Sequence, residues 1–220
     1  MTAACGLYAR LRLPQPWLPS SDTQKIPLVI YGASSAVGSY AIQFAKRSNI
    51  HPLICIAGRA QQHVEKMIDR SKGDTIIDYR KGDDAVVQGI QDALKGEKLQ
   101  YAFDAVSEKG SYQNICKVLD EQTGKITLVL PGKDYAEIPK TVEKTLTTVG
   151  SLHQDLKDFG YVCARYISRG LEEGWFKAQP QEIVPGGLKG VQKGLENLKA
   201  GNASAVKYIF KIADTPGVAS

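Results

Sequence analysis

The sequence predicts an α/β protein whose doubly wound parallel sheet is covered by helices on both faces, in three layers. Two observations predict this fold. Short apolar segments rich in β-branched or aromatic residues alternate along the chain with segments of helical periodicity. Strands joined by helical crossovers run parallel, and continuously apolar strands indicate that both faces of the sheet are buried. The pattern is typical of a six-stranded, Rossmann-type sheet.

Five of the strands are expected in the first 130 residues, and all five are short and apolar. They are 28–32 (LVIYG), 53–57 (LICIA), 74–78 (DTIID), 100–106 (QYAFDAV) and 125–130 (KITLVL). Between them, helical periodicity is clearest over 37–45 and 85–94. A sixth strand is expected at 147–152 (TTVGSL), followed by an amphipathic helix at about 155–172. A helix within 184–201 with a glycine stop and a last strand at 206–212 complete the prediction.

Residues 1–27 are expected to form a leading arm before the sheet. A short helix is predicted over 1–13, and the three prolines of the following PQPWLPSSD stretch prevent it from continuing. Residues 28–220 are then expected to form the Rossmann domain, so that the whole chain makes a single compact domain. At 220 residues the chain is long enough to bury a full core.

Composition and charge exclude several classes of protein. The net charge of +5 comes from 28 basic and 23 acidic residues spread along the chain, without the basic cluster that a nucleic-acid surface needs. No apolar run is long enough to span a bilayer, and the first ten residues contain no hydrophobic block of the kind found in a signal peptide. A cytoplasmic protein is therefore expected. The four cysteines and three histidines lack metal-ligand spacing, which favours reduced thiols and no metal site.

The turn after the first strand is the main functional signal. In GASSAVG (32–38), Ala33 and Ser35 replace the first two glycines of a G-x-G-x-x-G fingerprint, and only Gly38 keeps its place. Gly32 permits the tight turn, while Ser34 and Ser35 are small enough for a pyrophosphate to approach the free N–H groups of the helix. The same stretch also fits a serine-capped helix with no ligand, and the motif alone leaves both interpretations open.

The end of the second strand favours one cofactor over another. A carboxylate that binds a ribose 2′-hydroxyl is expected about 20 residues after the turn, but Gly58 and Arg59 stand there instead. An absent acid removes repulsion against a 2′-phosphate, and a guanidinium supplies a bidentate partner for it. NADP(H) is therefore favoured over NAD(H), although Arg59 could also be an ordinary solvated side chain.

Three stretches of the chain, TAACGLY, GASSAVGSYAIQFAK with IIDYR, and PGGLKGVQKGLENLKAG, together resemble the medium-chain dehydrogenase/reductase superfamily. Within it, the zinc-independent quinone oxidoreductase-like and fungal trans-enoyl reductase branches are the most similar. The resemblance runs from Thr2 to about Ile212 and implies a cofactor-binding site. The implied positions are Thr2 facing the nicotinamide, Ser34, Ser35, Ala36 and Val37 on the pyrophosphate, Gly58, Arg59 and Tyr79 around the 2′-phosphate and ribose, Val106 and Leu130 beside the ribose and nicotinamide, and the backbone of Ser151, Leu152 and His153 at the carboxamide.

The resemblance implies hydride transfer from NADPH to a small-molecule substrate, an activated C=C bond or a quinone or enone. It also implies a β-rich, chaperonin-10-like domain before the TAA helix, of which no trace is present, so the chain is expected to be incomplete for catalysis. No catalytic residue is assigned. Family dimers pair their sixth strands, so a homodimer is expected through TTVGSL. The alternative is a non-catalytic nucleotide-binding domain that self-associates; a zinc alcohol dehydrogenase, a serine hydrolase and a Walker A protein lack their motifs.

Overall fold

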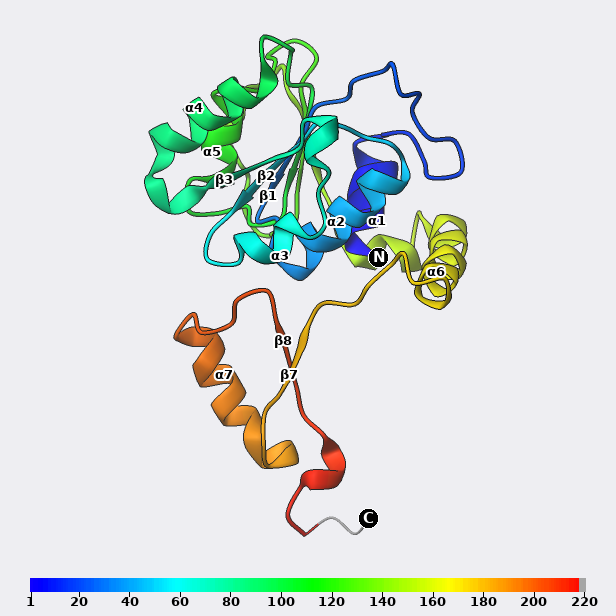
Figure 1. Cartoon of the computed structure of the whole chain (residues 1–220), viewed down its shortest axis with the longest axis vertical. Helices are drawn as coiled ribbons and strands as arrows, with labels where there is room; N and C mark the ends of the chain where they lie inside the picture. Colours follow the sequence, from blue (N-terminus) through cyan, green and yellow to red (C-terminus); the bar gives the residue numbers. More distant parts are fainter. Residues whose placement is uncertain (218–220) are drawn as a thin grey trace. The chain divides into compact units, whose positions relative to one another are not determined.

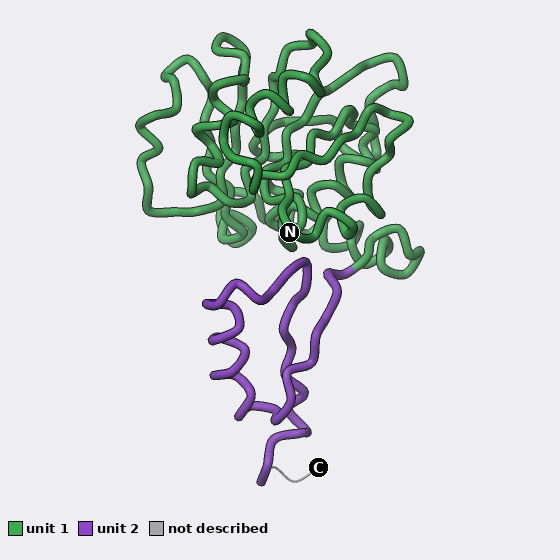
Figure 2. The backbone as a smooth tube through the Cα atoms, turned by 60° about the vertical axis from the view of Figure 1, so that its left-hand side comes forward, with its two compact units in different colours: residues 1–177 green, residues 178–220 purple. Residues whose placement is uncertain are grey.

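The computed structural model describes residues 1–217, which form two compact units. The first unit is Met1–Lys177, and the second begins at Ala178 (Figure 2). The predicted single domain over 28–220 stays a prediction, since compact units of one chain can fold together. Each unit is therefore described by itself.

The first unit is built on a six-stranded, wholly parallel sheet, as predicted (Figure 1). Its strands are β1 (Leu28–Tyr31), β2 (Leu53–Ala57), β3 (Thr75–Asp78), β4 (Tyr101–Asp104), β5 (Lys125–Leu128) and β6 (Glu143–Leu146). Their order in the sheet is β3-β2-β1-β4-β5-β6. The chain reverses its direction of winding between β1 and β4, and ligands of doubly wound sheets bind beyond the strand ends at this switch point.

The predicted position of the sixth strand is wrong. β6 covers Glu143–Leu146, whereas most of the predicted segment 147–152 lies in a 3₁₀ helix, η4 (Val149–His153). The Thr148 side chain begins that helix by accepting a hydrogen bond from Gly150 N. The strand escaped prediction because it lies at the edge of the sheet, where charged residues are favoured and the apolar signal is weak.

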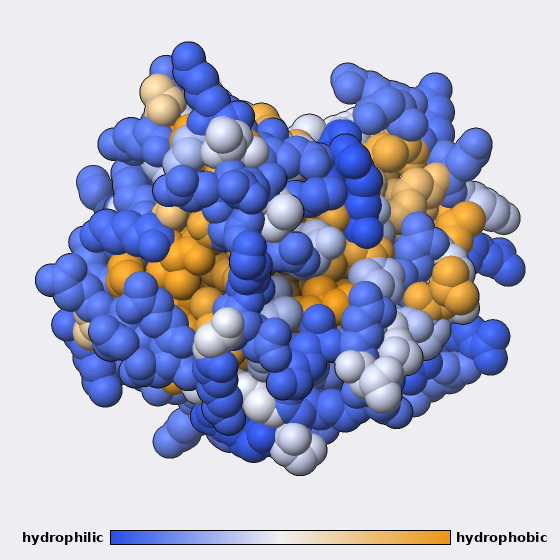
Figure 3. All heavy atoms as spheres, turned by 90° about the horizontal axis from the view of Figure 1, so that it is seen from above, coloured by the Kyte–Doolittle hydropathy of each residue, from blue (hydrophilic) through white to orange (hydrophobic). Residues whose placement is uncertain are grey.

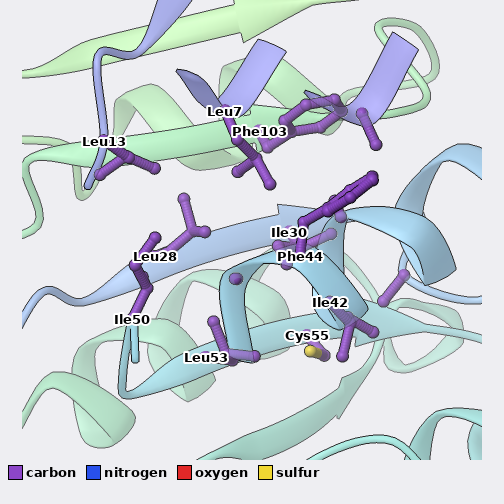
Figure 4. Close-up of a cluster of buried hydrophobic side chains, with 14 of the residues drawn as sticks. Leu7, Leu13, Leu28, Ile30, Ile42, Phe44, Ile50, Leu53, Cys55 and Phe103 are labelled. Carbon is purple, nitrogen blue, oxygen red and sulfur yellow. The ribbon is translucent and has the colours of Figure 1, made fainter. Parts of the chain in front are cut away.

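The three layers follow from the alternation of side chains along β1. Leu28 and Ile30 point to one face of the sheet, and Val29 and Tyr31 point to the other. On the first face the core contains side chains from β1, β2 and helices on that side, with Phe44 and Phe103 fully buried (Figure 4). The core of the opposite face is built on helices that follow β3 and β4.

Helices on both faces complete the first unit (Figure 1). They are α1 (Thr2–Ala4), α2 (Ala36–Arg47), α3 (Gln61–Glu65), α4 (Asp83–Leu94), α5 (Ser111–Cys116) and α6 (Lys157–Glu172). The predicted helix over 1–13 is observed as α1, which continues directly into a π-helix, η1 (Cys5–Arg10). Leu7 and Leu11 of this leading helix are 0% and 1% exposed, so it is part of the core of the first face.

The second unit pairs β7 (Gln181–Ile183) with β8 (Lys207–Ile209) in parallel and contains α7 (Val191–Lys199). The predicted last strand is thus confirmed but shorter than expected. The predicted glycine stop is also observed, because Gly201 takes φ +70° just beyond α7, a conformation that favours glycine.

Hydrophilic residues cover most of the face drawn in Figure 3, and hydrophobic residues show between them in separate patches. Among residues 1–217, no helix combines the length and the apolar character that a membrane span requires.

Candidate functional site

The turn after β1 is shaped by glycine and serine. Gly32 has φ +74°, a conformation that side-chain-bearing residues rarely adopt, and it reverses the chain into α2. Ser35 is the N-cap of α2, and its Oγ accepts a hydrogen bond of 3.0 Å from Gly38 N. The sequence left this serine as either a cap or a phosphate contact, and the structure shows the cap.

Gly38 lets α2 lie against the turn. A Cβ atom added to Gly38 would lie 2.3 Å from the carbonyl oxygen of Gly32 and 2.8 Å from Cα of Ala33. Both neighbours are backbone atoms, which cannot rotate away. Only glycine therefore allows the first turn of the helix to pack this closely, which explains why Gly38 keeps its place in the fingerprint.

The turn after β1 also contacts the end of β4. A Cβ atom on Gly32 would lie 2.6 Å from Cγ2 of Val106. The loop that carries Val106 is held by Asp104, whose carboxylate accepts hydrogen bonds from Val106 N at 2.9 Å, Ser107 N at 2.8 Å and Ser111 Oγ at 2.6 Å. Asp104 is completely buried, and this burial raises the pKa of its carboxyl group. These hydrogen bonds to Asp104 order the end of the strand.

Two predicted residues meet beyond β2 and β3. A Cβ atom on Gly58 would lie 2.6 Å from Cε1 of Tyr79, so the tyrosine ring occupies the space that any other residue would need. The ring is 48% exposed. Arg59, the next residue, is exposed as well. Glycine at position 58 is thus explained by the ring that lies on it.

Asp78 lies directly before Tyr79 and is neutralised by a neighbour. Its carboxylate accepts hydrogen bonds from Arg80 Nη2 at 2.6 Å, from Arg80 Nε at 2.9 Å and from Gln61 Nε2 at 2.8 Å. The Arg80 guanidinium lowers the pKa of Asp78 to about 2. Asp78 also caps the short helix η3 (Tyr79–Lys81), and its pairing with Arg80 and Gln61 was not predicted from the sequence.

The remaining predicted residues follow β5 and β6 or begin the leading helix. The carbonyl of Leu130 accepts a 2.5 Å hydrogen bond from the Tyr135 hydroxyl. Ser151 is 4% exposed, and Leu152 packs on Gly160, at which a Cβ atom would lie 3.1 Å from Cδ2 of the leucine. Thr2 is the first residue of α1.

The predicted residues thus come from the carboxyl ends of all six strands, together with the start of α1. The carboxyl ends of parallel strands lie at one edge of a sheet, which brings these segments to one side of it. Direct packing is observed for two pairs, Gly32 with Val106 and Gly58 with Tyr79. The roles of the predicted residues in binding a cofactor stay predictions.

The features at this edge of the sheet favour the binding of an anion. Backbone N–H groups at the start of a 12-residue helix favour an anion, and small side chains leave room for it. Among residues 1–217, no three side chains of His, Cys, Asp or Glu gather as a metal site would require. His153 ends η4 and is exposed.

Comparison with known proteins gives the following relationships. The trans-enoyl reductase fsr4 of Gibberella fujikuroi is 66% identical over 189 residues, which cover 86% of this chain and 56% of that protein. The trans-enoyl reductase himH of Aspergillus japonicus is 31% identical over 216 residues and is covered to 59%. The chain therefore spans less than two thirds of the length of these relatives. No family model matches the sequence.

Solved structures share the fold at low identity. The nucleotide-binding subdomain of the enoylreductase domain of PpsC from Mycobacterium tuberculosis has a TM-score of 0.56 at 14% identity, covering 80% of this chain and 94% of that one. A mycobacterial protein solved in complex with NADPH has a TM-score of 0.69 at 14% identity, and the match covers 94% of this chain and 61% of that one.

Proposed function

Because this chain is a relative of the fungal trans-enoyl reductases, within the medium-chain dehydrogenase/reductase superfamily, and corresponds to their nucleotide-binding part, we propose that it binds NADPH. It would present the nicotinamide for hydride transfer to an activated C=C bond. The observation that carries this proposal is the Gly38 contact, which brings the start of α2 against the turn after β1 and leaves backbone N–H groups as the phosphate site.

Three features at the strand ends support NADPH over NADH. No carboxylate ends β2, where one would bind a ribose 2′-hydroxyl. Arg59 is exposed beside Gly58, and a guanidinium is a suitable partner for a 2′-phosphate. Asp78, the acid that does end β3, is neutralised by Arg80 and so presents little repulsion to a phosphate.

The cofactor supplies the hydride when it is bound. The protein binds and orients it: Gly32 and Gly38 shape the phosphate turn, Tyr79 offers a ring for the adenosine end, and the Ser151 segment offers backbone groups for the carboxamide. An enoyl thioester or another conjugated carbonyl is the proposed substrate class, with a quinone as the other possibility. Turnover by the whole protein is proposed to need residues beyond those of this chain, because the related reductases are longer.

The test is titration of the full chain with NADPH and with NADH, followed by cofactor fluorescence. We expect NADPH to bind more tightly than NADH. Arg59→Ala should lower the affinity for NADPH about tenfold or more, because a charged hydrogen bond is lost, and should change the affinity for NADH little. Arg12→Ala is the matched control, because Arg12 is an exposed arginine that pairs with Glu143 at the start of β6. Equal affinity for both cofactors would contradict the NADPH assignment, and no binding of either would contradict the function.

We also propose that the chain forms a homodimer through the free edge of β6. Leu146 of this edge strand is 42% exposed and Val149 just beyond it is 47% exposed. An exposed strand edge with apolar side chains favours pairing with a second copy. A non-catalytic, self-associating domain is the alternative function, and a dimer that binds neither cofactor would favour it.

Four free cysteines and the relationship to reductases support a cytoplasmic location in our proposal.

A further inference from the structure

Arg10 joins two segments that are 141 residues apart in the sequence. Its Nη2 donates a hydrogen bond of 2.8 Å to Oγ of Ser151, which is 4% exposed. Arg10 is the last residue of the π-helix η1, which continues from α1 and so from Thr2. Ser151 lies in the middle of η4, beyond the carboxyl end of β6.

The charge of Arg10 is poorly compensated. Its side chain is only 25% exposed, and its one ion-pair partner among residues 1–217, Asp155, lies 3.6 Å away on a side chain that is 58% exposed. Nε of Arg10 is buried and has no hydrogen-bond partner among the described residues. A partly buried guanidinium with a buried, unpaired N–H group stabilises a fold less than an apolar side chain of similar size. Stability alone therefore does not account for arginine at this position.

We propose that Arg10 is a positioning residue for the nicotinamide half of the cofactor: its bond to Ser151 holds η4 against the helix that begins at Thr2. The inference rests on the proposed function and on the positions that the family resemblance implies, with Thr2 and the Ser151–Leu152 backbone facing the nicotinamide from these two segments. Arg10 itself does not touch the cofactor in this proposal. It fixes the distance between the two segments that do.

The test compares two ligands that share the adenosine end. NADPH carries the nicotinamide, whereas adenosine 2′,5′-bisphosphate does not. In Arg10→Met, we expect the affinity for NADPH to fall about tenfold, the effect of one charged hydrogen bond, with the affinity for the bisphosphate unchanged. Thermal stability should change little, since the unpaired N–H group is gone while the buried Ser151 hydroxyl loses its donor. Arg10→Lys, which keeps a donor for Ser151, should recover part of the NADPH affinity, and Arg12→Met serves as the matched control.

Three results would decide against the inference. Unchanged NADPH affinity in Arg10→Met would show that the Ser151 bond does not act on the cofactor. Loss of both affinities together with a lower melting temperature would show that Arg10 is only structural. If the unmodified chain binds the bisphosphate and NADPH equally well, the nicotinamide makes no contact to be positioned. Failure of the unmodified chain to bind either ligand would instead contradict the proposed function, and this inference with it.

Discussion

Tyr79 lies on the backbone of Gly58, so closely that a Cβ atom at position 58 would be 2.6 Å from the ring and 2.8 Å from the hydroxyl oxygen. The two residues follow neighbouring parallel strands, paired in register from Ile54 with Thr75 to Ala57 with Asp78. Tyr79 is about half exposed. Its ring can lie on the backbone at position 58 because the glycine there has no side chain.

For Gly58→Ala we expect the tyrosine ring to be displaced rather than the fold to be disrupted. Stability should change by less than about 1 kcal/mol, because an exposed ring can rotate away. NADPH affinity should fall by a factor of about 5 to 10, equivalent to the loss of one ring contact. Fluorescence titration and thermal unfolding measure the two effects.

The tyrosine supplies the control for that substitution. In a Tyr79→Ala background, Gly58→Ala should have no further effect on NADPH affinity, because the group it displaces is gone. Full additivity of the two substitutions would show that Gly58 acts by some other route, and the interpretation of this contact would then be wrong.

Asp78 makes stability depend on acid pH. Arg80 lowers the pKa of Asp78 from 3.8 to about 2 in the folded chain, so the ionised form favours folding. The contribution of ionised Asp78 to the free energy of unfolding is complete when the pH is above the pKa that Asp78 has in the unfolded chain. It is lost as the pH falls through about 2, the pKa in the folded chain. We expect Asp78→Asn to lower the free energy of unfolding by about 1 to 2 kcal/mol at pH 7, a value reduced for solvent screening of the exposed Arg80.

Urea unfolding at pH 6 and pH 3 checks this expectation. The difference between the unmodified chain and Asp78→Asn should be smaller at pH 3. Asp92→Asn is a suitable control, because Asp92 is exposed on α4 and accepts only a hydrogen bond from Gln88 among the described contacts. A difference for Asp78→Asn that is the same at both pH values would mean that the pairing with Arg80 does not stabilise the fold.

The proposed dimer can be tested without breaking the sheet. Glu143 N and Thr147 N both donate to β5, to the carbonyls of Gly124 and Leu128. Alternate residues of a parallel strand bond to the same neighbour, so the N–H group of Leu146 faces the free edge. Proline is tolerated at such a position, where it removes only the outward donor.

We expect Leu146→Pro to convert a dimer into a monomer, measured by sedimentation or light scattering at tens of micromolar chain. NADPH affinity should be retained, which shows that the fold is intact. Leu146→Val keeps the N–H group and should stay dimeric. Persistence of the dimer in the proline variant would place the interface elsewhere, and a monomeric unmodified chain would remove the proposal.

The sheet could be predicted from sequence because β1 and β2 are fully buried and apolar, and because β3, β4 and β5 each carry a short apolar core of residues between helical segments. β6 could not be placed, since Glu143 and Lys144 are polar side chains of an edge strand, with Glu143 pairing with Lys125 and Lys144 donating to carbonyls of the preceding loop. The following apolar residues therefore gave the stronger signal, although they form η4.

Local features of the candidate site were also predictable. The tight turn at Gly32 and the need for Gly38 follow from residues next to each other in the chain, and the structure confirms both. The bond between Arg10 and Ser151 depends on the fold as a whole, because no pattern in the sequence relates residues so far apart. The pairing of Asp78 with Arg80 is local, and an acid two residues before an arginine was a signal that could have been used.

The contact between Gly32 and Val106 has a consequence for the spacing of the strand ends at the switch point. A Cβ atom on Gly32 would lie 2.6 Å from Cγ2 of Val106, so the turn after β1 and the loop after β4 approach each other as closely as a glycine permits. Any side chain at position 32, or a larger one at position 106, would force the two loops apart. Such a change would widen the place across which ligands of doubly wound sheets lie, without altering the residues that follow β2 and β3.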